Sequence, residues 1–193
     1  VALVRCSGAK VYDKDGNPIP NVYVDQNQDG EIDANDLVVK HSKDPKVTIN
    51  WNNNFSYKNW DLGFVLRASI GNYVFNGVRP GAINLTNIQG QGSRLNNVLV
   101  SDFYFNDNSA VTNLVRSSYF LENAGFLRCD NITLGYTFPN LLNNNLKLRV
   151  FGAVQNPFVI TKYSGLDPEV FSGVDSNTYP RPTTYSLGLV ATF

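Results

Sequence analysis

Hydrophobic and polar side chains alternate along five segments of this chain. The segments are 48–57, 62–70, 128–136, 146–154 and 184–193. In the first of them, Ile49, Trp51 and Phe55 share one face, while the residues opposite them are Asn, Ser and Thr. Because successive side chains of a β-strand point to opposite faces, a period of two predicts strands that meet a different environment on each side.

The connections between these segments alternate between short and long. Short turns at 58–61 and 138–145 join the first pair and the second pair of segments. The long connections are the stretch before Val47, then 72–119 and 162–183. Outer-membrane barrels have short periplasmic turns and long extracellular loops, so the pattern predicts an up-and-down meander with its long links outside the cell.

The predicted fold class is therefore all-β, and the chain is expected to supply the C-terminal antiparallel strands of a large transmembrane β-barrel. It would contribute five strands, or six if residues 1–6 end another strand. No stretch approaches about 18 consecutive apolar residues, which excludes a transmembrane helix, whereas a barrel strand needs only about 9–11 residues. Aromatic side chains near the strand ends (Trp51, Tyr57, Trp60, Tyr73, Phe138 and Tyr163) resemble the aromatic girdles at membrane interfaces.

Composition narrows the class of protein without settling it. Only 17% of the residues are charged, and 12% are aromatic. The 16 basic and 16 acidic residues cancel, which argues against a nucleic-acid partner. There is no Met, and Val1 opens an apolar run without a signal peptide, so we expect a segment of a longer chain. Cys6 and Cys129 could form a disulfide or could both be unpaired.

Residues 25–36 form the sharpest chemical motif. Oxygen-bearing side chains occupy loop positions 1, 3, 5 and 12 (Asp25, Asn27, Asp29 and Asp36), and Gly30 at position 6 allows the sharp turn. Glu31 at position 7 would offer its backbone carbonyl, and Asp33 at position 9 a ligand through water. The spacing predicts a calcium site of the dockerin type, in which the Asp at position 12 gives modest affinity. The alternative is a solvated acidic turn.

This calcium site is expected to be structural rather than regulatory. The segment before Asp25 has the pattern of a strand, so the helix–loop–helix arrangement that opens on calcium binding is missing. We expect the ion to rigidify an extracellular loop.

No catalytic constellation stands out, and we do not expect an enzyme. His41 is the only histidine, and it lies in a polar segment without a nucleophile-elbow motif. The acidic residues show no spacing typical of an acid/base pair.

Several blocks along the chain resemble one family, the SusC/RagA-type TonB-dependent transporters of Bacteroidetes outer membranes. The blocks are 23–30, 32–33, 55–62, 71–72, 118–128, 131–136, 155–156, 161–169, 179–182 and 185–189. Their order and spacing are together highly specific. Cys129 departs from the family pattern, in which an aliphatic residue is usual.

The resemblance implies a role in nutrient uptake. Members of this family form 22-stranded plugged barrels in the outer membrane, work with a SusD-like surface lipoprotein, draw energy from the TonB complex and import oligosaccharides or peptides. Residues 1–193 would then be the C-terminal part of the barrel, with the plug domain and the TonB box outside this chain. The remainder of the barrel must close the sheet, because open edges are not tolerated in lipid.

The segment 184–193 fixes the expected orientation. Its apolar face is Tyr185, Leu187, Leu189, Ala191 and Phe193, a pattern that resembles the C-terminal signal of outer-membrane barrels. Phe193 would lie at the periplasmic rim and the loop 25–36 outside the cell. The alternative function is a secreted, calcium-stabilised β-sandwich that binds a glycan or a protein.

Overall fold

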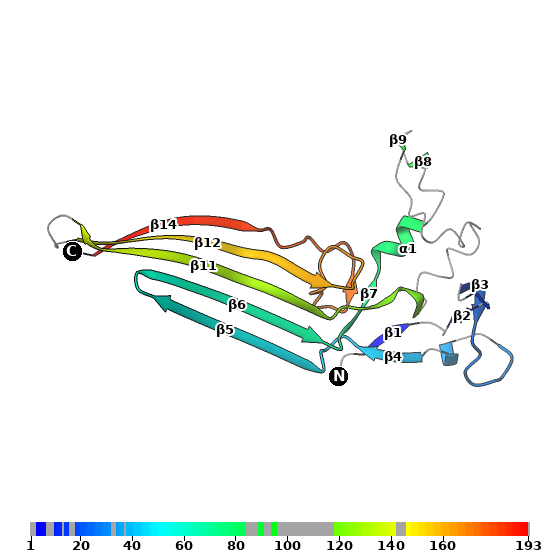
Figure 1. Cartoon of the computed structure of the whole chain (residues 1–193). Helices are drawn as coiled ribbons and strands as arrows, with labels where there is room; N and C mark the ends of the chain where they lie inside the picture. The colour runs from blue at the N-terminus through cyan, green and yellow to red at the C-terminus, as the bar shows by residue number, and fades with distance from the viewer. Residues whose placement is uncertain are drawn as a thin grey trace. The chain divides into compact units, whose positions relative to one another are not determined.

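The structure is a computed structural model, which describes residues 3–6, 10–12, 14–15, 18–31, 34–36, 38–83, 89–90, 94–95, 118–141 and 146–192. The chain divides into two compact units with separate sheets (Figure 1). Unit 1 comprises Val1–Pro45, Gly71–Ala124 and Tyr163–Tyr179. Unit 2 comprises Lys46–Ile70, Gly125–Lys162 and Pro180–Phe193.

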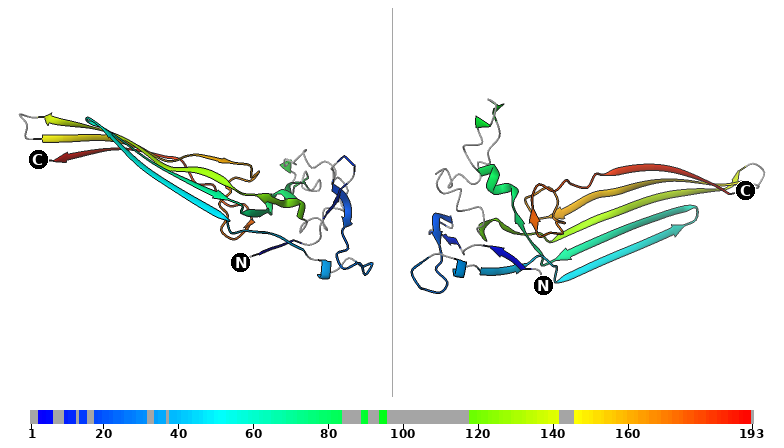
Figure 2. Two further views of the ribbon diagram at one scale, coloured as in Figure 1. Left: turned by 60° about the horizontal axis from the view of Figure 1, so that its bottom comes forward. Right: turned by 180° about the vertical axis from the view of Figure 1, so that it is seen from behind.

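Unit 2 is one antiparallel sheet of five strands. They are β5 (Val47–Tyr57), β6 (Trp60–Ile70), β11 (Phe126–Leu141), β12 (Leu146–Thr161) and β14 (Thr184–Thr192). Each strand pairs with its neighbours in chain order, as Figure 2 shows from two further directions. All five predicted strands are confirmed, and with them the all-β fold class. Phe193 lies outside the described residues.

The predicted strands 128–136 and 146–154 are longer than the alternation indicated. Strands β11 and β12 each have 16 residues. The pattern failed at their ends because Pro139, Asn156 and Pro157 interrupt the regular exchange of apolar and polar positions. The ladder between β11 and β12 skips these positions and resumes beyond them, where Cys129 pairs with Phe158 and Leu141 pairs with Leu146.

The β5–β6 hairpin sets the register of the first two strands. Pairing runs without interruption from Val47 opposite Ile70 to Tyr57 opposite Trp60. Its turn contains Lys58 with a φ of 53°, the left-handed conformation that two-residue hairpin turns require. The carbonyl of Asn59 also accepts a hydrogen bond from the amide of Thr137 at 2.8 Å, which ties the turn to β11.

Strand β11 changes register at one shared point with both of its neighbours, and a second time with β12 between Phe138 and Leu141. The shared shift falls between Cys129 and Asn131 in the ladders with β6 and with β12. On β12 the irregularity coincides with Asn156, whose φ is 49°. Such bulges redirect side chains. This one places Asp130 on the polar face of the sheet, whereas regular alternation would place it on the opposite face.

Unit 1 contains short strands and little helix. The pairs are β1 (Leu3–Cys6) with β4 (Val38–Ser42), β2 (Lys10–Tyr12) with β3 (Pro18–Tyr23), and β8 (Gln89–Gly90) with β9 (Arg94–Leu95). A three-stranded sheet has β7 (Tyr73–Asn76) between β10 (Leu121–Asn123) and the parallel β13 (Val174–Asp175). The helical segments among the described residues are η1 (Ala34–Asp36), α1 (Val78–Ile83) and η4 (Ser118–Phe120).

The structure decides two alternatives that the sequence leaves open. Strand β1 pairs with β4, so residues 3–6 do not add a sixth strand to the sheet of unit 2. Cys129 carries a free, buried thiol, which decides against a disulfide with Cys6.

The described part of unit 1 contains one cluster of buried hydrophobic residues. Val74, Ala124 and Tyr163 are buried together, with Val170 packed against them. Phe120 is also fully buried and meets the ring of Phe75 edge-on. Among the described residues, no helix is both long and apolar enough to cross a membrane.

Candidate functional site

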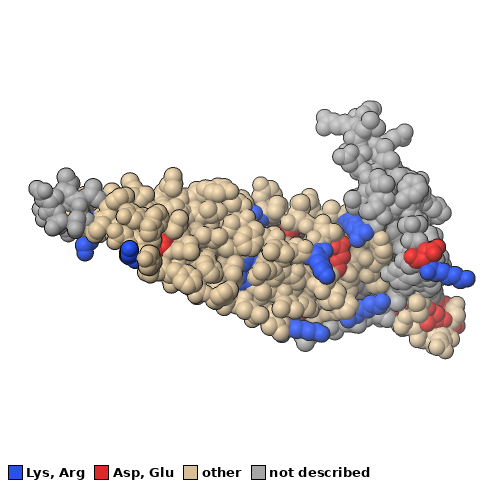
Figure 3. All heavy atoms as spheres, in the orientation of Figure 1, with Lys and Arg blue, Asp and Glu red and all other residues tan. Residues whose placement is uncertain are grey.

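The two faces of the unit 2 sheet differ in chemistry. One face exposes large apolar side chains, among them Tyr57, Tyr185, Leu187 and Leu189, and Leu187 is 90% exposed. The opposite face carries the charged side chains Asp61, Arg67, Arg128 and Arg149. Uncharged residues dominate the surface over the strands of unit 2 in Figure 3. The predicted alternation is therefore present in the structure. One face of the sheet is apolar and exposed, and the opposite face carries the charged side chains.

Near the short turns, the polar face is organised by an ion pair. Arg149 donates from Nε to Oδ1 of Asp61 at 2.9 Å and from Nη2 to Oδ2 at 2.5 Å. The pair lies over Gly135, where a Cβ atom would meet both side chains at 2.5–2.7 Å. Two parallel bonds fix both the position and the plane of the guanidinium group.

Phe151 is the aromatic exception that interrupts the alternation on this face. Its ring lies against Gly188 on β14, where a Cβ atom would clash with the ring. The Arg149 guanidinium carbon lies 4.8 Å from the centre of the ring, within the range of a cation–π contact. Glycine at 188 thus gives the ring its space, and Arg149 gives it a polar partner.

On the apolar face, aromatic rings gather beside the same turns. Trp60 and Tyr136 meet edge-on with their ring centres 4.8 Å apart, and Tyr136 meets Phe138 at 4.7 Å. The rings line part of an apolar groove of about 520 Å³. Indole and phenol rings favour the boundary between lipid and water, so this cluster matches the predicted girdle.

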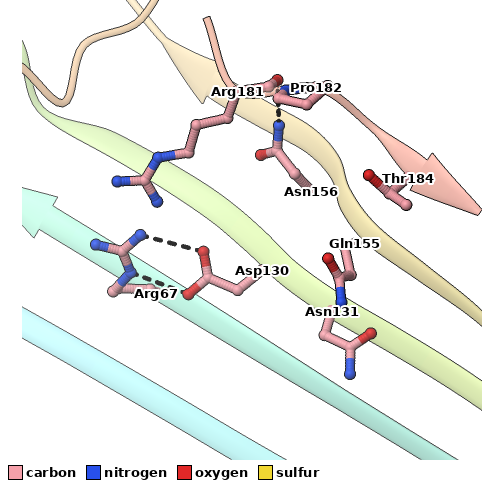
Figure 4. A pocket seen from close by; sticks show the side chains of 8 residues that line it. All are labelled: Arg67, Asp130, Asn131, Gln155, Asn156, Arg181, Pro182 and Thr184. Atoms are coloured by element: carbon pink, nitrogen blue, oxygen red, sulfur yellow. Dashed lines mark hydrogen bonds and ion pairs between the residues drawn. The ribbon is translucent and has the colours of Figure 1, made fainter.

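At the opposite end of the strands, the polar face forms a recess of about 500 Å³ (Figure 4). We call it the polar recess. It is lined by Arg67, Asp130, Asn131, Gln155, Asn156, Arg181, Pro182 and Thr184. The residues come from β6, β11, β12, the first residue of β14 and the segment that leads into it, so the recess exists only when these strands pair.

A second ion pair forms one wall of the polar recess. Arg67 donates from Nε to Oδ2 of Asp130 at 3.0 Å and from Nη2 to Oδ1 at 3.1 Å. Both side chains are about 30% exposed, at 28% and 32%. The bulge brings Asp130 onto the face of Arg67, and Figure 4 shows the two bonds between them.

Asn156 holds the other wall. Its side-chain amide donates to the backbone carbonyl of Arg181 at 2.8 Å, and its own backbone carbonyl accepts a hydrogen bond from the hydroxyl of Thr183 at 2.9 Å. Its Oδ1 also accepts a bond from Nη1 of Arg128 at 2.8 Å. This one residue therefore anchors the segment 181–183 beside β12 and orients Arg128.

The predicted calcium loop is described at five of its six ligand positions. Oδ1 and Oδ2 of Asp25 accept the amides of Gln28 and Gly30 at 2.6 and 2.8 Å. The buried Asp36 accepts the amide of Gln26 at 2.7 Å, which joins the two ends of the loop. Gly30 has a φ of +85°, as the sharp turn at position 6 requires.

The rest of the loop is similarly bonded to itself. Asp29 accepts the amide of Glu31 at 2.9 Å and the side-chain amide of Asn27 at 2.6 Å. Asp33 lies outside the described residues. Within the described part of the chain, no group of three or more His, Cys, Asp or Glu side chains is arranged to hold a metal ion. Calcium binding stays a prediction.

In unit 1, Glu122 is the centre of a polar cluster. Oε1 accepts bonds from Ser164 Oγ at 2.8 Å, from Asn76 at 3.2 Å and from Arg79 at 3.3 Å, and Oε2 accepts the amide of Ser164 at 2.9 Å. His41 is exposed and stacks on Tyr73, with ring centres 3.7 Å apart. Both arrangements join segments of unit 1.

The sequence did not single out the polar recess. The position of Arg67 on a polar face was visible in the alternation. The positions of Asp130 and Arg181 beside Arg67 could not be predicted from the alternation. They depend on the bulge in β11 and on the hydrogen bond from Asn156 to the carbonyl of Arg181. Residues 179–182 form one of the blocks that resemble the family, and their sequence alone predicts no structural role.

A meander of five antiparallel strands with one polar and one outward apolar face defines a wall segment of a transmembrane β-barrel. No protein-family model matches the chain. SusC of Bacteroides thetaiotaomicron, a TonB-dependent receptor, is 42% identical over 195 residues, which cover 95% of this chain and 19% of SusC. TonB-dependent receptor P3 of Formosa agariphila is 26% identical over 203 residues, or 94% of this chain and 20% of that protein.

Solved structures agree on the fold. The RagAB peptide importer in its closed-closed state gives a TM-score of 0.66 at 26% identity, covering 94% of this chain and 20% of that one. A structure of the RagAB peptide transporter gives a TM-score of 0.67 at 24% identity, over 98% of this chain and 22% of that one. The chain belongs to the TonB-dependent receptors of the SusC/RagA type. It spans about a fifth of the length of the relatives that it matches.

Proposed function

We propose that this chain forms part of the barrel wall of an outer-membrane importer that takes up nutrients with energy from TonB. The observation that carries the proposal is the exposed apolar face of unit 2. Leu187, Tyr185 and Leu189 are 70% exposed or more on a strand whose other face is polar. In water such a face would favour aggregation, whereas in a bilayer it is the favourable surface.

The proposed orientation follows from the strand ends. The links before Val47, after Ile70, after Thr161 and before Thr184 all meet one end of the sheet, and the short turns lie at the other. Long loops of outer-membrane barrels are extracellular, so the polar recess opens toward the outside and the Asp61–Arg149 pair lies toward the periplasm. Assignment to the C-terminal part of the barrel remains a prediction.

The proposed partners are a SusD-like lipoprotein, the TonB complex and the rest of the barrel. The proposed substrates are oligosaccharides or peptides. Support comes from the relatives, since SusC is a TonB-dependent receptor and RagAB is a peptide importer. Exposed Phe171 and Tyr179 on the link after β12 are suited to contact a protein partner at the cell surface.

The test uses the full-length transporter with an affinity tag in its native host. We expect a surface lipoprotein to co-purify and growth on the imported nutrient to require both the transporter and TonB. A transporter that isolates alone and whose deletion leaves growth unchanged on oligosaccharides and on peptides would refute the importer.

A second experiment distinguishes the barrel hypothesis from the alternative of a soluble β-sandwich. The isolated chain should aggregate in buffer without detergent, because the apolar face of unit 2 is uncovered. A monodisperse, folded monomer in buffer would favour the sandwich.

We further propose that residues 25–36 bind one calcium ion as a structural element. Asp25, Asn27, Asp29, Asp33 and Asp36 would supply side-chain oxygens, and Glu31 its carbonyl. The support is the turn at Gly30 and the bond from Gln26 to Asp36, which already bring both ends of the loop together.

A further inference from the structure

We propose that the apolar groove on the unit 2 sheet is a binding site for one phospholipid of the outer membrane. An acyl chain of the lipid would lie in the groove, with its phosphate beside Lys58. This proposal rests on the importer function, because it needs the apolar face to lie in a membrane, and it adds a ligand that is not cargo. The site would hold one lipid tightly, whereas lipids around the rest of the wall exchange freely.

The groove exists because the apolar face has a gap at Gly152. In the two ladders of β12, this glycine pairs with Leu134 on one side and with Leu187 on the other. Both leucines project from the sheet, with exposed fractions of 48% and 90%, whereas the glycine between them has no side chain. A Cβ atom at residue 152 would make no contact shorter than 3.5 Å, so the space above its backbone is open. The gap can therefore receive part of another molecule.

The lining of the groove favours a hydrocarbon chain. Beside the gap it includes the side chains of Trp60, Tyr136, Phe138 and Val150, and none of the lining residues is charged. The hydroxyl of Tyr136 accepts a hydrogen bond from the side-chain amide of Asn59 at 3.5 Å, in the β5–β6 turn. The volume of about 520 Å³ lies within the range of about 300–1,000 Å³ that is usual for small-molecule sites. A polar ligand would lose its hydrogen bonds to water in this groove, whereas an acyl chain has none to lose.

A cation lies beside the end of the groove that is near the short turns. Lys58 is exposed in the β5–β6 turn, and its Nζ lies 5.4 Å from the ring centre of Tyr57. Tyr57 pairs with Trp60, which lines the groove. Among the described residues, no acidic side chain forms an ion pair with Lys58. The ammonium group is thus placed to bind the phosphate of a lipid whose chain enters the groove.

The position of the groove along the strands identifies the class of lipid. The groove lies near the β5–β6 turn and the start of β12, at the end of the sheet that we propose to face the periplasm (Figure 1). Phospholipids form the periplasmic leaflet of an outer membrane, and lipopolysaccharide belongs to the other leaflet. The strands that complete the barrel would pair with the free edges of β5 and β14, whereas the gap lies over β12 inside the sheet. The groove would therefore stay open to phospholipid in the closed barrel.

The experiment measures lipid binding by native mass spectrometry on the full-length transporter, purified in detergent with its lipoprotein. Lipids that survive purification are first identified by mass, and the complex is then stripped of them. Two probes with the same chains are added in parallel, palmitoyl-oleoyl phosphatidylglycerol and palmitoyl-oleoyl glycerol, which has no phosphate. We expect the tightest site of the native complex to prefer the phospholipid about tenfold.

Two variants assign this lipid to the groove, and each has a matched control. Gly152→Leu fills the groove and should lower the affinity for phosphatidylglycerol about tenfold. Ala68→Leu enlarges an apolar side chain on the same face, outside the groove, and should bind as the native protein does. Lys58→Asn removes the cation, suits the φ of 53° at this position and should abolish the preference for the phospholipid. Lys147→Asn removes a positive charge from the polar face of β12 and should retain it.

Several results would overturn the lipid site. They are equal binding of the two probes, native binding by either groove variant, an equal loss in a control variant, and lipopolysaccharide as the lipid that Gly152→Leu fails to retain. If Gly152→Leu does not assemble, the comparison of Lys58→Asn with Lys147→Asn decides alone. Co-purification of the lipoprotein and dependence of growth on TonB test the importer itself, so the two proposals can fail independently.

Discussion

Asp61 and Arg149, on strands that are not neighbours in the sheet, bond to each other across Gly135 of the strand between them. The pair is possible because residue 135 has no side chain, so the carboxylate and the guanidinium group can meet directly above its backbone. Three strands are thereby joined on the polar face beyond their ladder bonds.

Gly135→Ala should lower the stability of the barrel by about 1–3 kcal/mol, because the added methyl group displaces the ion pair. The detergent-purified barrel is incubated at increasing temperatures and run on a gel. The measurement is the temperature at which the band of the compact, folded barrel is replaced by that of the unfolded chain. Gly152→Ala is the matched control, since its Cβ would make only an ordinary 3.5 Å contact with Leu187. Its stability should change by less than about 1 kcal/mol. Equal effects of the two substitutions would contradict the role of Gly135.

Leu187→Arg should impair assembly in the outer membrane, because a cation on the lipid face of a barrel costs about 2–4 kcal/mol near the bilayer centre. Ser186→Arg is the control on the adjacent residue, whose side chain lies on the polar face. The amount of heat-resistant barrel in outer-membrane fractions compares them. Equal amounts of the two assembled variants would contradict the assignment of the Leu187 face to lipid and of the Ser186 face to a polar environment.

The hydroxyl of Tyr163 donates to Oδ2 of Asp175 at 2.7 Å inside unit 1. Burial, and secondly the bond to Asp175, raise the pKa of Tyr163 well above its ordinary value. The folded state thus keeps this phenol protonated at a pH where the unfolded chain ionises it. The stabilising contribution is complete below about pH 10 and is lost as the pH rises above that value.

We therefore expect the stability advantage of the native protein over Tyr163→Phe to shrink above pH 10, by about 1.4 kcal/mol per pH unit. Denaturant unfolding at several pH values measures this difference. Tyr179→Phe is the control, because Tyr179 is 85% exposed, and its difference should not change with pH. A constant difference for Tyr163→Phe would show that the phenol ionises equally in both states.

Asp29→Ala should remove one calcium site from the full-length transporter, as measured by calorimetry with calcium chloride. The substitution deletes a proposed ligand and the bonds that Asp29 accepts from Asn27 and Glu31. Asp44→Ala, an exposed acidic residue outside the loop, should leave calcium binding unchanged. If Asp29→Ala binds calcium as the native protein does, residues 25–36 are only an acidic turn.

Local alternation was enough to predict the five strands and their two faces. Alternation is a local property of successive residues, so segments such as 48–57 could be placed without knowing their neighbours. The ends of β11 and β12 did not follow from alternation, because Pro139 and Pro157 break the pattern while pairing with adjacent strands continues the sheet. Phe151 interrupts the alternation of 146–154, and only the neighbouring strand explains it, because its ring lies against Gly188 on β14.

Tertiary structure alone decided where the charged groups meet. Arg67, Asp130 and Arg181 lie far apart in the chain and have no common spacing that a pattern could detect. The register shift after Cys129 moves Asp130 beside Arg67, and the bond from Asn156 places Arg181 opposite them. Local periodicity fixes which way a side chain points, whereas register between strands fixes what it touches, and register is a property of the whole sheet.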